Sequence, residues 1–226
     1  MNMKEIPVTL VIPDTLYGKL FTHLFPGDGD EHGAVIAAGL AKSDRGIRLL
    51  AREVFLAQDG KDYVPGGMGY RMLKPQFIYE KLHYCREQKL CYLAVHNHGG
   101  DRHVAFSPVD LASHDRGYPA LLEISGGLPV GAVVFAKAAA AGDIWFSRNQ
   151  RSPLKETRIA GRNIRRLYPQ PPRLLGLNDP TYDRQMMLFG SVGQRILANC
   201  RVGIVGVGGI GSLVVEYLAH LGVGSL

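Results

Sequence analysis

The stretch LCYLAVHNHGGDRHVAFSPVD, residues 90–110, decides the fold of the N-terminal part of this chain. Residues 90–95 are apolar and rich in strand formers, which predicts a buried strand. The strand ends in His96 and His98, and residues two apart in a strand point to the same face, so both imidazoles can converge on one ion. Ser107-Pro108 is typical of a helix start, because serine caps the helix and proline fits its first position.

A carboxylate lies close to this predicted helix start. Asp110 falls in the first turn, where its side chain can turn back toward the end of the strand. Two imidazoles and one carboxylate form a three-ligand set for zinc and leave a fourth position for water. A lone histidine is more often a hydrogen-bonded surface or core residue, but this strand–loop–helix context favours a metal site. His96, His98 and Asp110 are therefore the candidate ligands.

The segments around this stretch predict an α/β architecture. Hydrophobic patterns and turn signals predict strands over 6–12, 31–40, 47–56, 121–124, 130–136 and 144–146, and helices over 13–25, 75–88 and 107–116. This order of elements indicates one mixed sheet flanked by helices.

Composition is that of an ordinary soluble protein, with 46% hydrophobic and 20% charged residues in 226. The sequence has no run of eighteen apolar residues and no apolar signal core near Met1, so we expect neither a membrane span nor export. Three scattered cysteines fit the reducing cytoplasm.

The net charge of +6 comes from one region. Residues 151–173 contain seven basic residues and one acid, which accounts for the whole excess (7 − 1 = 6). Lysine and arginine can neutralise phosphates, but no interleaved aromatic residues accompany them here, so we do not expect nucleic-acid binding. The favoured interpretation is a solvated helix and linker, with docking to an acidic partner as the alternative. Prolines near 169–180 also indicate a linker.

A different motif follows the linker. Residues 201–205 are apolar and predict a strand, residues 206–212 form a glycine loop, and apolar residues then recur with helical period. Strand, glycine loop and helix together predict a nucleotide phosphate cradle, the first βα unit of a Rossmann-like fold. The expected organisation is thus a domain over 1–150, a basic proline-rich linker over 151–180 and the start of a second domain over 181–226.

The pattern His96-x-His98 with Ser107-x-x-Asp110 resembles the signature of the JAMM/MPN zinc metalloproteases. This family cleaves ubiquitin-like proteins from lysines or trims their C-termini, on a cytidine-deaminase-like mixed sheet. The resemblance implies that the two histidines and Asp110 bind zinc, that Ser107 stabilises the oxyanion and that an upstream glutamate is the general base. Glu31 matches best, and Asp30 is the alternative. Two departures, an extra loop residue and Gly99 in place of the usual proline, fall in a loop that tolerates insertions.

The C-terminal motif resembles the start of the ThiF/MoeB adenylating enzymes, which activate ubiquitin-like and sulfur-carrier C-termini. The resemblance covers 182–226, and implies that Arg184 contacts phosphates, in the same subunit or a partner, and that the domain forms homodimers. It implies that the following residues face ATP: Gly206, Gly208, Gly209, Gly211 and Ser212. The later catalytic residues of that family do not occur before Leu226, so we do not expect this chain to adenylate on its own.

These resemblances predict a zinc isopeptidase or processing protease that acts on a ubiquitin-like or sulfur-carrier protein and is fused to an adenylating domain of the same pathway. A non-catalytic MPN-type scaffold is the second hypothesis, although a scaffold would not need the metal ligands. The third is an NAD-dependent oxidoreductase fragment with an unrelated N-terminal domain.

Overall fold

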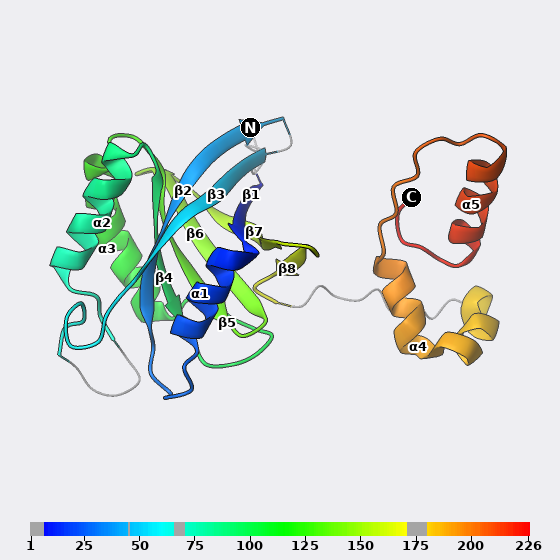
Figure 1. Cartoon of the computed structure of the whole chain (residues 1–226), viewed down its shortest axis with the longest axis horizontal. Coiled ribbons are helices and arrows are strands. Elements are labelled where there is room, and N and C mark those ends of the chain that lie inside the picture. The colour runs from blue at the N-terminus through cyan, green and yellow to red at the C-terminus, as the bar shows by residue number, and fades with distance from the viewer. Residues whose placement is uncertain (1–6, 45, 66–70, 171–179) are drawn as a thin grey trace. The chain divides into compact units, whose positions relative to one another are not determined.

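Strand β4 (Cys91–Asn97) lies at the centre of the N-terminal unit of the computed structural model (Figure 1). The structure describes residues 7–44, 46–65, 71–170 and 180–226. Within them, the chain forms two compact units, Met1–Pro171 and Pro172–Leu226. β4 pairs with β2 (Gly33–Ser43) on one side, antiparallel, and with β5 (Val130–Ala136) on the other, parallel. It is buried on both faces, as the apolar sequence predicts.

The sheet closes into a barrel of seven strands. Its remaining strands are β1 (Val8–Pro13), β3 (Gly46–Leu56), β6 (Ala139–Ser147) and β7 (Gln150–Ala160), in the order β1-β3-β2-β4-β5-β6-β7. β1 pairs in parallel with both β3 and β7, which closes the ring, and the short β8 (Arg165–Leu167) adds to β7. The prediction of a mixed sheet flanked by helices, of the JAMM/MPN, cytidine-deaminase-like type, is therefore wrong, because pairing of β1 with β7 joins the two ends of the sheet.

β7 also corrects the interpretation of the basic segment. A helix and linker are expected from residue 151, but β7 and β8 occupy much of this region. Ser152, Leu154 and Glu156 are buried and alternate with exposed residues. Glu156 remains ionised because Arg158 and Arg166 pair with it, and together with the Tyr168 hydroxyl they outweigh burial and lower the pKa of its carboxyl.

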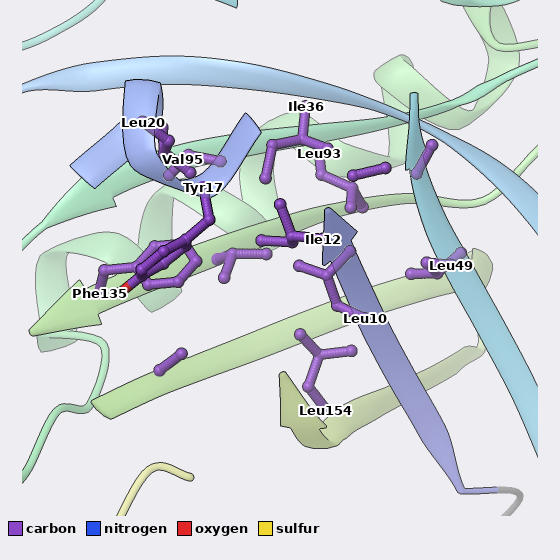
Figure 2. Packing of buried hydrophobic residues seen from close by; sticks show 14 of the residues in the cluster. Leu10, Ile12, Tyr17, Leu20, Ile36, Leu49, Leu93, Val95, Phe135 and Leu154 are labelled. Atoms are coloured by element: carbon purple, nitrogen blue, oxygen red, sulfur yellow. The ribbon is translucent and has the colours of Figure 1, made fainter. Parts of the chain in front are cut away.

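The barrel interior holds the largest apolar cluster. Figure 2 shows Leu10, Leu93 and Phe135 from three strands packed with Tyr17 and Leu20 of helix α1 (Asp14–Leu24). On the outer face, α2 (Pro75–Glu87) and α3 (Pro108–Ile124) cover a second cluster on the sheet. α3 continues through residues 121–124, so the strand predicted there is wrong.

The C-terminal unit is helical. It contains the 3-10 turn η1 (Pro180–Tyr182), α4 (Asp183–Asn199) and α5 (Gly209–His220). The strand predicted over 201–205 is wrong; its region makes only an isolated bridge from Arg201 to Ser225, so no Rossmann-like βα unit forms. A buried strand of that kind needs neighbouring parallel strands, and the described part of this unit has none. In the described residues no helix is long and apolar enough to cross a membrane.

Candidate metal centre

The two histidines lie where β4 leaves the sheet. His96 is in β4, and His98 continues the extended chain because its N–H donates to the carbonyl oxygen of Phe135. Both rings lie on the outer face, and their Nε2 atoms are 3.1 Å apart. Asp110 Oδ2 lies 3.7 Å from Nε2 of His96 and 3.4 Å from Nε2 of His98. One ligand atom from each of these three residues lies within 4.8 Å of the others, as a shared ion requires.

A backbone carbonyl orients His98. Nδ1 of this ring lies 3.0 Å from the carbonyl oxygen of Ala105, in the loop that follows the ligand pair. A ring that donates from Nδ1 presents the lone pair of Nε2 to the centre, and this arrangement recurs in protein metal sites. The Ala105 carbonyl is a supporting group that the sequence analysis missed, because backbone acceptors leave no sequence signal.

Asp110 is positioned by the start of α3. Its Oδ2 accepts hydrogen bonds from the Ser107 N–H at 2.8 Å and the Ser107 hydroxyl at 2.7 Å, while the Asp110 N–H donates to Ser107 Oγ at 3.1 Å. This is a capping box. Burial raises the pKa of Asp110, but His96 and Ser107 outweigh it and hold this pKa well below its ordinary value. The carboxyl is therefore ionised at neutral pH, as a metal ligand must be.

Ser107 lies beside the centre, but its hydroxyl is already engaged. A serine has one O–H donor, and here that donor is used by Asp110 Oδ2. The hydroxyl must rotate before it can donate to a substrate oxygen. The Ser107 N–H would still hold Asp110 during that rotation.

Glu31 completes the cluster from a distant segment. It lies two residues before β2, whose pairing with β4 places Gly33 opposite His96. Its Oε1 lies 3.6 Å from Nε2 of His98, so the carboxylate of Glu31 lies at the centre. Burial raises the pKa of this carboxyl, and the electrostatic effect of His96 and His98 opposes the shift.

Asn97 holds the segment that carries Glu31. Its side chain points to the face opposite His96 and His98, because alternate residues of a strand face opposite ways. Asn97 Oδ1 accepts the N–H of His32 at 2.6 Å, and Nδ2 donates to the Asp30 carbonyl at 3.4 Å. One buried amide therefore binds the backbone on both sides of Glu31. The sequence does not predict this role; its only signal is an amide between two histidines on a buried strand.

We expect Asn97→Ala to lower the turnover of any reaction that needs Glu31, while zinc content stays unchanged. The substitution leaves the His32 N–H buried without its acceptor, a cost of about 1–3 kcal/mol. A displacement of about 1 Å at a catalytic group can cost roughly 100-fold in rate. Elemental analysis and kcat measured together test this, and Asn97→Asp, which keeps the Oδ1 acceptor, is the control. Loss of zinc in the alanine variant would contradict a role limited to Glu31.

His114, four residues after Asp110, does not support that ligand. Its Nδ1 is buried without a hydrogen-bond partner and lies 3.5 Å from Oδ2 of Asp143.

Two of the hollows that adjoin the centre border His98. The smaller, about 440 Å³, is lined by Glu31, His98, Ser107 and Asp110 among others. The larger, about 900 Å³, extends from Glu31 and His98 past acidic Asp28 and Asp101 to Lys137. The candidate ligands are therefore accessible from outside.

The glycine loop of the C-terminal unit leads into a helix start. Gly208 precedes α5, and Gly206 has a φ of +92°, a conformation that favours glycine. A Cβ at Gly211 would collide with the carbonyl oxygen of Gly206. The Ser212 N–H donates to Gly208 O, and its hydroxyl to Gly209 O. Arg184 lies in the first turn of α4, and none of its described contacts joins it to this loop.

Comparison with known proteins matches a family to one segment of the chain. Residues 182–226 match the ThiF family. No curated protein matches the chain. Among solved structures, the solution structure of protein DSY2949 from Desulfitobacterium hafniense aligns with 67% of this chain and 92% of that one, at 9% identity and a TM-score of 0.43. The segment 182–226 is therefore ThiF-like.

Proposed function

We propose that the N-terminal unit is a zinc-dependent peptidase that releases a ubiquitin-like or sulfur-carrier protein from an amide-linked group. The observation that carries this proposal is the convergence of His96, His98 and Asp110, with Glu31 at 3.6 Å from His98. Three such ligands with a carboxylate beside them are the donor set of hydrolytic zinc sites. The JAMM-type signature adds support at the level of residues, and the proposal does not depend on that family's sheet, because sites recur on different folds.

The residues divide the work of amide hydrolysis. A zinc ion held by the three ligands would lower the pKa of a coordinated water to about 7 and polarise the substrate carbonyl. Glu31 accepts a proton from the attacking water and delivers it to the leaving nitrogen, so that the amide and one water become a carboxylate and an amine. The Ser107 hydroxyl, after rotating from Asp110, donates to the carbonyl oxygen as it gains negative charge.

The ThiF-like segment supports the choice of substrate. We propose that it belongs to an adenylating domain that binds ATP at Gly206 to Ser212 and acts on the same modifier. One half would then expose or recycle the C-terminus that the other activates. A helix that starts after a glycine loop suits a phosphate group, and the geometry at Gly206 and Gly211 agrees with such a loop.

The test uses the whole chain loaded with zinc and two probes. One is ubiquitin that carries a fluorescent amine on its C-terminal glycine, and the other is a sulfur-carrier protein with a C-terminal peptide extension. We expect release of the fluorophore or the extension, inhibition by a chelator and recovery with zinc. A protein that contains no zinc, or a zinc-loaded protein that leaves both probes intact, would contradict the proposal and favour a binding scaffold.

A further inference from the structure

We propose that a cavity beside the metal centre is a subsite for a large apolar group, aromatic or branched, on the amine side of the amide bond that the centre cleaves. This inference rests on the proposed function and adds a substrate preference to it. The cavity has a volume of about 270 Å³ and lies among β4, α2 and α3, on the side of the centre where His96 lies.

The walls of the cavity are mainly apolar. Side chains from β4, β5 and the two covering helices form them: Ile78, Tyr92, Ala94, Tyr118, Leu121 and Ala132. The ring of His114 also lines the cavity and packs edge-on against Tyr118, with ring centroids 4.8 Å apart. Aromatic walls favour an aromatic guest, which can stack or meet them edge to face.

The cavity shares its wall with the centre itself. Glu31, His96 and Asp110 line it together with the apolar residues. A substrate carbonyl that reaches the candidate ion therefore has the mouth of the cavity beside it. The hollow past His98 has a mixed lining that includes Phe25, Asp101 and Lys137, so it lacks the apolar character of this cavity.

The volume fits the proposed guest. An apolar protein cavity of about 150 Å³ takes up benzene, so about 270 Å³ has room for a phenyl ring or a branched alkyl group. A single methylene in a hydrophobic subsite changes discrimination by about 10-fold or more. A whole ring should therefore raise affinity at least about tenfold over a methyl group.

Gly117 keeps part of this space open. It lies within α3 and lines the cavity, and a Cβ placed on it would meet no atom within 4 Å. A leucine at this position can therefore extend into the cavity without a clash at its first carbon. Gly18 provides a matched control, because it is an exposed helical glycine in α1 with the same free space around a Cβ, and it lines none of these hollows.

The experiment compares two hydroxamates, which chelate zinc through two oxygens and need no turnover. Acetohydroxamate carries only a methyl group, and 3-phenylpropanohydroxamate carries a phenyl ring. Their Kd values are measured by calorimetry on the zinc-loaded whole chain and on its Gly117→Leu, Gly117→Ala and Gly18→Leu variants. We expect the wild type and Gly18→Leu to prefer the phenyl compound at least about tenfold. Gly117→Leu should lose this preference and still bind acetohydroxamate with wild-type affinity.

Each outcome separates the subsite from the metal centre. Equal affinity of the wild type for the two hydroxamates, or an unchanged preference in Gly117→Leu, would overturn the subsite and leave the centre intact. If neither compound binds, the proposed metal centre is absent and the subsite falls with it. Gly117→Ala keeps the test valid if the leucine variant does not fold, because alanine is the better helix former and should reduce the preference in part.

Discussion

Glu31→Gln is expected to leave zinc bound at the candidate centre and to lower kcat roughly 100- to 10,000-fold. A glutamine fills the same space and still faces His98, but it cannot accept the proton of an attacking water. Glu31 is not one of the three grouped ligands, so zinc content should remain at the wild-type level. Elemental analysis of the purified variant and its rate on the ubiquitin probe measure the two effects separately.

Asp30→Asn is the matched control for this experiment. Asp30 is the neighbouring acid, and Asn97 donates to its backbone carbonyl, which Asp30→Asn leaves in place. If Glu31 is the general base, this replacement should leave kcat within a few-fold of the wild-type value. A large loss of activity in Asp30→Asn with little change in Glu31→Gln would show that Asp30, and not Glu31, is the general base. The ligand set would still stand.

The candidate centre could be predicted from sequence because most of it is local. His96, His98, Ser107 and Asp110 lie within fifteen residues of one another, and the strand, loop and helix start between them have clear signals. Strand alternation brings the two rings to one face, and the Ser107 cap orients Asp110. Glu31 is different, because only the pairing of β2 with β4 brings it to this site. The residues alone did not predict that pairing, and the family resemblance supplied the assignment.

The barrel could not be predicted because its closure depends on distant pairs. β1 and β7 are more than 130 residues apart in sequence, yet their pairing decides whether the sheet is open or closed. The charges of β7 also concealed its period of two. Its basic residues suggested a solvated segment, although Glu156 is buried and its carboxylate is satisfied by Arg158, Arg166 and Tyr168. Burial of a charge depends on such partners, and a single sequence does not identify them.

The end of α3 illustrates a second kind of error. Leu121 and Leu122 next to Ile124 resemble a short strand, and Pro119 suggests that the helix has already ended. The structure instead continues the helix, with His114, Tyr118 and Leu122 buried at intervals of four residues. Packing of this face against the sheet outweighs the local cost of proline.

Asp110→Asn is expected to abolish most of the stabilisation that zinc confers. A ligand that binds only the folded state stabilises it by about 4 kcal/mol at a free concentration 1,000 times its Kd. For a domain of this size that corresponds to a rise in Tm of about 10 °C in the wild type. Asparagine offers a neutral oxygen in place of a carboxylate. Since even loss of a supporting group costs zinc affinity about 10- to 100-fold, we expect a loss of at least about 100-fold here.

A simpler explanation of Asp110 is that it only caps α3, since Ser107 and Asp110 form a complete capping box. Ser107→Ala separates the two roles. It removes the hydroxyl from the cap and should lower the stability of the metal-free protein by about 0.5–2 kcal/mol, yet keep more of the zinc-induced rise in Tm than Asp110→Asn, because Ser107 supports the ligand without binding the ion. Asp110→Asn should do the reverse, because its amide oxygen can still accept the Ser107 N–H. If both variants keep the full zinc effect, Asp110 is a helix cap and not a ligand. If Ser107→Ala mainly lowers the stability of the metal-free protein and Asp110→Asn mainly lowers the zinc-induced rise in Tm, one carboxylate both caps the helix and binds the ion.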